Sequence, residues 1–167
     1  MQKKQNNYAF VDSNNLYLGV KELGWFVDYK KFRRYLREKY DVEKAYVFIG
    51  FVPGNQELYM AMQDAGFICV FKETYARDDG AIKGNCDAEL VLHCMIEYPN
   101  YDHAIIVTGD GDFACLVKYL KDQDKLRAVI APSRHYCSFL LRKASANAVA
   151  HLEFLRGKLA YKKKSTP

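Results

Sequence analysis

One stretch of the sequence reads Ile105-Ile106-Val107-Thr108-Gly109-Asp110-Gly111-Asp112-Phe113. Its branched apolar residues predict a buried strand, and its two glycines predict a turn from which a helix begins. The carboxylates of Asp110 and Asp112 would then lie at the carboxyl end of that strand, where open α/β sheets bind their ligands. Asp110 stands out because its flanking glycines allow a close approach between backbone and ligand.

A second stretch has the same shape and reads Tyr8-Ala9-Phe10-Val11-Asp12-Ser13-Asn14-Asn15. If its strand lies beside the strand that precedes Asp110, the carboxylates of Asp12, Asp110 and Asp112 converge. Clustered carboxylates repel one another unless a cation neutralises them. Because oxygen ligands favour hard divalent cations, the sequence predicts a site for Mg²⁺ or Mn²⁺.

The composition limits the class of protein. A chain of 167 residues that is 50% hydrophobic is long enough for one domain with a substantial core. Its net charge of +5 is compatible with a nucleic-acid partner. No apolar run reaches the roughly 20 residues of a membrane span, and the polar residues 1–7 are not followed by a signal-peptide core. Five cysteines without C-x-x-C spacing favour a reduced, cytoplasmic environment, and the 14% aromatic content leaves room for a homodimer surface.

Apolar runs alternate with amphipathic helical patterns along the chain. The alternation predicts one α/β domain with a parallel sheet of about five strands, in the order 3-2-1-4-5, and helices on both faces. We expect the domain at residues 8–161, between a polar N-terminal extension (1–7) and a basic C-terminal tail (162–167). The connection 72–84 has no clear period and is expected to be a functional loop. Predicted strands cover residues 8–11, 45–52, 67–71, 104–108 and 127–131, and predicted helices cover residues 28–40, 56–65, 87–98, 112–121, 138–145 and 152–161.

In this topology four aspartates reach one edge of the sheet. Asp12 and Asp110 follow the first and fourth strands, while Asp87 and Asp112 begin the helices before and after the fourth strand. The first and fourth strands are neighbours, so the crevice where the winding reverses lies between their ends. Each acid alone also fits an ordinary role, since Asp87 and Asp112 suit helix N-termini and Asp12 suits an Asx turn.

Polar, cationic and aromatic residues near that edge are candidates for holding a substrate. Asn15 and Thr108 could orient a phosphate oxygen or a water, although a helix cap and a plain strand position also explain them. Lysine and arginine neutralise phosphates, and a tyrosine can stack on an unpaired base. An exposed loop position is the alternative explanation for each cation and for the tyrosine. The candidate substrate contacts are Asn15, Thr108, Lys83, Arg77, Tyr75 and Arg134.

Three motifs together resemble the NYN domain, the LabA-like branch of the PIN-like nuclease superfamily. They are Phe10-Val11-Asp12-Ser13-Asn14-Asn15, Lys83-Gly84-Asn85-Cys86-Asp87-Ala88-Glu89-Leu90 and Thr108-Gly109-Asp110-Gly111-Asp112-Phe113. Their order and spacing also match, and the third motif is the most specific. The resemblance covers residues 8–159.

The resemblance implies a PIN-like, Rossmann-like fold and metal-dependent cleavage of RNA. We interpret the activity as that of an endoribonuclease that acts on single-stranded RNA. Ser13 only loosely matches the small residue that the family places after its first aspartate, and Cys86 stands where an aliphatic residue is usual. Carried over onto this sequence, the catalytic and metal-binding residues are Asp12, Asp87, Asp110 and Asp112, accompanied by the polar Asn15.

Other interpretations fit less of the sequence. Asp110-Gly111-Asp112 also has the D-x-D pattern of Toprim domains, but those domains pair it with a glutamate where this chain has Asp12. A haloacid-type phosphatase would need a second aspartate where Asn14 stands, and a dinucleotide-binding domain would need G-x-G-x-x-G after the first strand. The alternative that stays is a non-catalytic RNA- or protein-binding module of the same fold with a vestigial metal site.

Overall fold

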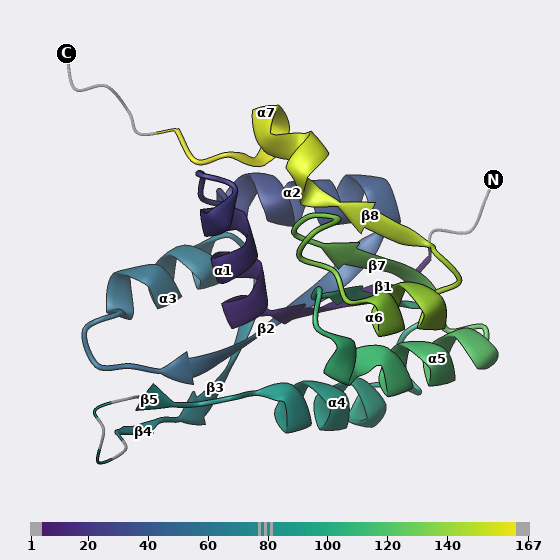
Figure 1. Cartoon of the computed structure of the whole chain (residues 1–167), viewed down its shortest axis with the longest axis horizontal. Coiled ribbons are helices and arrows are strands. Elements are labelled where there is room, and N and C mark those ends of the chain that lie inside the picture. The colour runs from purple at the N-terminus through teal and green to yellow at the C-terminus, as the bar shows by residue number, and fades with distance from the viewer. Residues whose placement is uncertain (1–4, 77, 79, 81, 163–167) are drawn as a thin grey trace.

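A single parallel sheet runs through the molecule in the order β3-β2-β1-β6-β7-β8 (Figure 1). It is seen in a computed structural model that describes residues 5–76, 78, 80 and 82–162. The predicted α/β class and the order of the five predicted strands are confirmed, and β8 adds a sixth strand at the edge. The strands are β1 (Asn7–Asp12), β2 (Val42–Phe51), β3 (Ile68–Glu73), β6 (Ala104–Val107), β7 (Leu126–Ala131) and β8 (Val149–His151).

The helices agree with the predicted pattern except at two places. Helix α1 was not predicted, because its polar residues and Gly19 obscure the apolar stripe formed by Leu16 and Val20. The predicted helix 152–161 is instead a 3₁₀ turn (Leu152–Leu155) followed by one short helix. The helices are α1 (Ser13–Glu22), α2 (Tyr29–Tyr40), α3 (Gln56–Asp64), α4 (Asp87–Ile96), α5 (Ala114–Asp122), α6 (Phe139–Ala144) and α7 (Arg156–Leu159).

The connection 72–84 is more ordered than its sequence predicted. Its first residues extend β3 as far as Glu73, and it then forms a two-stranded antiparallel hairpin of β4 (Tyr75–Ala76) and β5 (Ile82–Lys83). Figure 1 shows this hairpin beside the carboxyl ends of β2 and β3. The hairpin therefore lies at the edge of the sheet where the candidate residues were expected.

Side chains of the central strands alternate between two cores, one on each face of the sheet. Ala9 and Val11 of β1 pack in the core under α1, α2, α3 and α7, whereas Tyr8 and Phe10 pack in the core under α4, α5 and α6. Both sets are almost fully buried. Burial on both faces explains the continuous apolar runs of the strands. No helix in the described part of the chain is long and apolar enough to cross a membrane.

The strand register fixes what meets at the carboxyl edge. Strand β1 lies between β2 and β6, and Val11 pairs with Val107 in parallel register. The residues that follow this pair, Asp12 and Thr108, therefore lie side by side. The winding of the sheet reverses between β1 and β6, which is where a crevice forms in doubly wound sheets.

Candidate active site

Asp12 ties the ends of the two central strands together. It ends β1 and caps α1, where its Oδ1 accepts a hydrogen bond from the backbone N–H of Asn15 at 3.2 Å. Its Oδ2 accepts one from the hydroxyl of Thr108 at 3.0 Å. The same Thr108 oxygen accepts a hydrogen bond from the backbone N–H of Asp110 at 3.1 Å. Thr108 thus positions Asp12 and Asp110 relative to each other.

The turn that carries Asp110 is held on two sides. The side-chain oxygen of Asn15 accepts a hydrogen bond from the backbone N–H of Gly109 at 2.7 Å. On the other side, a Cβ added at Gly109 would lie 1.8 Å from the carbonyl oxygen of Tyr136, so only glycine fits there. The backbone N–H of Ser138 also donates to the carbonyl of Gly109 at 2.8 Å. The turn is therefore fixed between α1 and the loop that follows β7.

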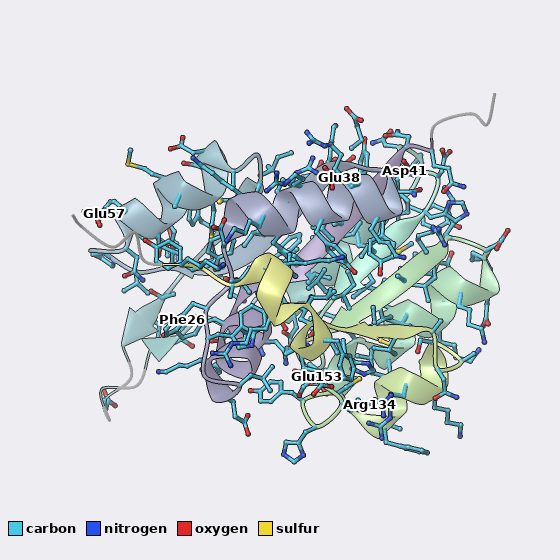
Figure 2. All side chains as sticks on the ribbon, turned by 90° about the horizontal axis from the view of Figure 1, so that it is seen from above. Phe26, Glu38, Asp41, Glu57, Arg134 and Glu153 are labelled. Carbon is cyan, nitrogen blue, oxygen red and sulfur yellow. The ribbon has the colours of Figure 1, made fainter. Side chains whose placement is uncertain are left out.

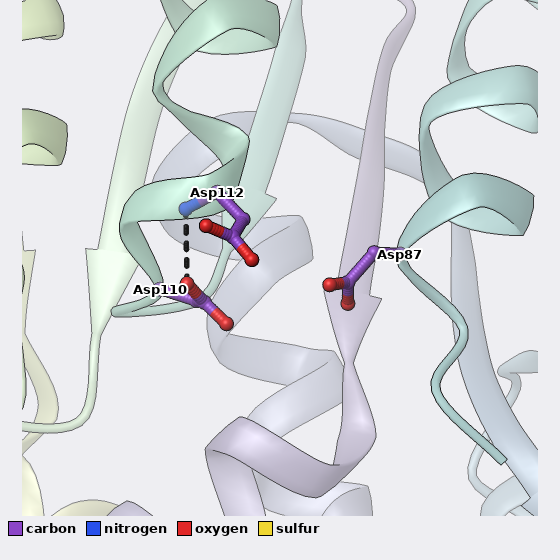
Figure 3. Close-up of side chains that lie close together, drawn as sticks. All are labelled: Asp87, Asp110 and Asp112. Atoms are coloured by element: carbon purple, nitrogen blue, oxygen red, sulfur yellow. Dashed lines mark hydrogen bonds between the residues drawn. The ribbon is translucent and has the colours of Figure 1, made fainter. Parts of the chain in front are cut away.

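Three carboxylates meet beside this turn (Figure 3). One oxygen from each of Asp87, Asp110 and Asp112 lies within 4.8 Å of the other two. Asp110 Oδ1 accepts a hydrogen bond from the backbone N–H of Asp112 at 2.9 Å. Asp87, the first residue of α4, exchanges two hydrogen bonds with Asn85, of 3.0 and 2.8 Å. Asn85 was missed as a positioning residue, although an asparagine two residues before an aspartate is a recognisable turn pattern.

The carboxylate of Asp12 lies outside this group of three but interacts electrostatically with Asp87 and Asp110. Burial raises the pKa of the Asp12 carboxyl, and the negative charges of Asp87 and Asp110 raise it further, against the two hydrogen bonds that Asp12 accepts. Burial also raises the pKa of Asp87, and Asp110 and Asp112 add to that rise. The four acids thus form a site with excess negative charge, which suits a divalent cation with hard oxygen ligands.

The acids line a large cleft that is also lined by aromatic side chains. The cleft has a volume of about 1600 Å³, and Asp12, Asp87 and Asp110 line it together with Tyr17 and Phe26. The rings of Tyr17 and Phe26 are stacked, with centroids 6.0 Å apart, and both side chains are exposed. The sequence analysis did not predict these two residues as part of the site, since Tyr17 lies on the unpredicted α1 and Phe26 in the loop that follows it.

The NYN domain family model matches residues 8–150 of this chain. The chain belongs to the NYN domain family. It is 26% identical over 122 residues to the low amplitude and bright protein LabA of Synechococcus elongatus, and the match covers 67% of this chain and 66% of LabA. A crystal structure of a protein of unknown function from Vibrio parahaemolyticus has the same fold, with a TM-score of 0.77 and 25% identity. The alignment covers 91% of this chain and 96% of the Vibrio chain.

The remaining candidate contacts of the NYN domain lie in different places. Lys83 belongs to β5 and pairs with Tyr75 of β4, whose ring is exposed, and Arg77 falls outside the described residues. Residues at the base of this hairpin, Thr74 and Gly84, line the cleft. Arg134 follows β7 and lines a second, smaller pocket. Arg134 therefore follows the strand that the sequence predicted, but it lines a pocket apart from the acids.

Lys72 contacts residues on both sides of Asp87. Its ammonium contacts both carboxylate oxygens of Glu89, at 2.9 and 3.1 Å, and donates to the carbonyl of Asn85 at 2.7 Å. Its charge is paired with Glu89, and it only partly opposes the rise in the pKa of Asp87. Lys72 instead secures the segment that positions Asp87.

The raised pKa of Asp87 predicts how the stability of the metal-free NYN domain depends on pH. A carboxyl whose pKa in the folded state exceeds its ordinary value of 3.8 binds a proton more tightly when folded. Its contribution to stability therefore falls as pH rises through the folded pKa, and the cost is fully present at pH 7. In chelator, Asp87→Asn should be more stable than the wild type at pH 7, and the difference should shrink toward pH 4. Urea unfolding at both pH values measures this.

The matched control is Asp122→Asn, which removes an exposed acid that pairs with Lys118 on α5. It should show no such gain at pH 7, because an exposed ion pair contributes little to the free energy of unfolding. A wild type that is as stable as Asp87→Asn at pH 7 in chelator would contradict the electrostatic description of the site.

Proposed function

We propose that this NYN domain hydrolyses phosphodiester bonds of RNA with the help of Mg²⁺ or Mn²⁺. The observation that supports it most strongly is the convergence of oxygens from Asp87, Asp110 and Asp112 within 4.8 Å of one another. Membership of a family of nuclease-like domains points to the same chemistry. Four acids crowd one site, with raised pKa values at Asp12 and Asp87, and this is the donor set that a hard divalent cation requires.

Each acidic residue has a distinct role in this proposal. Asp87 and Asp110 would hold the cation, and Asp12 would add a further carboxylate while it fixes the turn through Thr108. When bound, the cation would lower the pKa of water and neutralise charge on the phosphate. Asp112, the exposed member of the group, would orient the water that attacks the phosphate. Asn15 keeps the backbone of Gly109 in place, so it acts on the geometry of Asp110.

Single-stranded RNA is the substrate that the cleft supports best. Tyr17 and Phe26 offer exposed, stacked rings in the same cleft as the acids, and the ammonium of Lys21 lies 5.6 Å from the ring centroid of Tyr17. Aromatic rings bind unpaired bases by stacking on their faces, and duplex bases hide those faces. Tyr75 on the hairpin would add a further ring for stacking, and Arg134 would contact phosphate farther along the sheet edge. Arg77 and Lys83 are proposed, from the sequence alone, to add positive charge toward the phosphates.

The experiment is incubation of the purified protein with labelled RNA in Mn²⁺, in Mg²⁺ and in chelator. We expect cleavage of single-stranded RNA in the presence of a divalent cation, none in chelator, and slower cleavage of a duplex of the same sequence. A circular single strand should also be cut, because we propose endonucleolytic action. Binding of RNA without any product in Mn²⁺ or Mg²⁺ would favour the non-catalytic module instead.

A further inference from the structure

A second pocket lies at the same edge of the sheet, on the side of β8. Its volume is about 320 Å³, at the small end of the range for ligand sites. The loop that follows β7 separates it from the large cleft, since Tyr136 lines the cleft and Arg134 lines the pocket. The pocket is rich in hydrogen-bond donors, and its lining residues are Arg134, Arg142, Asn147, Val149 and His151.

Neutral groups hold the two arginines in place. One terminal nitrogen of Arg142 donates to the carbonyls of Cys137 at 2.9 Å and of Arg134 at 3.4 Å. The guanidinium carbon of Arg134 lies 5.7 Å from the ring centroid of Phe154. Among the described residues, neither guanidinium forms an ion pair with a carboxylate. Both positive charges are therefore positioned but not neutralised.

Glu153 is an acid that lies close to Arg134 (Figure 2). Its carboxylate accepts a hydrogen bond from the backbone N–H of Arg134 at 2.8 Å, so it orders the loop. His151 also lines the pocket, and its Nε2 is buried and has no hydrogen-bond partner among the described residues. Burial lowers the pKa of His151, the charge of Glu153 opposes this, and the charges of Arg134 and Arg142 add to the lowering.

We propose that this pocket binds a phosphate group through the guanidinium groups of Arg134 and Arg142, with the Asn147 amide as a further donor. Guanidinium groups match phosphate oxygens in geometry and charge, and a bond between two charged partners is about twice as strong as a neutral one. The phosphate could belong to an internal position or to the 5′ end of an RNA strand. The proposal concerns binding only and does not require that the acidic site cleaves RNA.

The test measures binding in chelator, so that cleavage cannot interfere. Three probes are titrated against the full chain: inorganic phosphate, a short single-stranded RNA with a 5′-phosphate, and the same RNA with a 5′-hydroxyl. The variants are Arg142→Gln and the exposed Arg134→Gln. The control is Lys143→Gln, which removes an equal charge from the next position on α6 and lies outside the described lining of the pocket. Circular dichroism and thermal melting show that each variant is folded.

We expect inorganic phosphate to bind the wild type, and each arginine variant to weaken that binding by about tenfold, as the loss of one charge-assisted hydrogen bond implies. Lys143→Gln should leave it within about twofold. If only the 5′-phosphorylated RNA loses affinity in the variants, the pocket takes a strand end, and if both RNAs lose it equally, the pocket takes an internal phosphate. Equal losses in the arginine variants and in Lys143→Gln, or no binding of inorganic phosphate to the wild type, would overturn the proposal.

Discussion

Asp110→Asn is expected to abolish metal-dependent RNA cleavage while the protein stays folded. Asp110 is the acid that connects the site, because it belongs to the group with Asp87 and Asp112 and is tied to Asp12 through Thr108. Losing the charge of a direct metal ligand should lower the cleavage rate by more than about 100-fold, since even outer partners of metal ligands are worth about 10- to 100-fold.

The asparagine preserves the local structure, which makes the result interpretable. Its side-chain oxygen can still accept the hydrogen bond that Asp110 Oδ1 accepts from the backbone N–H of Asp112. Thermal melting in chelator should therefore match that of the wild type or exceed it, because one of the repelling charges is gone. Added Mn²⁺ should raise the melting temperature of the wild type by mass action, and that rise should be lost in the variant.

Asp122→Asn is the control here too, because it removes an acid that pairs with Lys118 on the surface of α5. Its cleavage rate and its response to Mn²⁺ should equal those of the wild type. Undiminished cleavage by Asp110→Asn would refute the proposed role of the acidic group, whatever the family membership of the chain.

Gly109→Ala is expected to cause a large loss of stability. The added Cβ would lie 1.8 Å from the carbonyl oxygen of Tyr136 and 2.9 Å from its carbonyl carbon. These are backbone atoms, and the hydrogen bond from Ser138 N–H to the Gly109 carbonyl holds the two segments together. Overpacking of this kind costs about 3 kcal/mol, which lowers the melting temperature of a chain of this length by about 6–12 °C.

The matched control is Gly157→Ala in α7, where an added Cβ meets no atom within 4 Å. Alanine favours the helix there, so the melting temperature should be unchanged or slightly higher. Urea unfolding of both variants in chelator measures the difference in the free energy of unfolding. Equal stability of the two variants would mean that the turn carrying Asp110 does not pack against the loop after β7 as described.

The sequence predicted much of the fold because its signals are local. The apolar runs that became β1, β2, β6 and β7 are buried on both faces, and such runs are visible without any knowledge of their neighbours. The short edge strand β8 has only three residues, all half-buried, so it left no comparable pattern. Helix α1 was hidden for a different reason: Gly19 packs against Pro132, where a Cβ would lie 2.5 Å from the proline ring. That contact exists only in the folded chain.

By itself, the sequence indicated the α/β class through its periodicity, the strand order through the doubly wound arrangement typical of that class, and the aspartates at one edge through the parallel direction of the strands. Tertiary structure decided which atoms meet. The register of β1 and β6 placed the Thr108 hydroxyl on Asp12, and this left Asp87, Asp110 and Asp112 as the closest group. Tertiary structure also brought the rings of Tyr17 and Phe26 together, and it placed the guanidinium of Arg142 against the carbonyl of Cys137. Contacts between residues far apart in the chain depend on register and close packing, which no local pattern records.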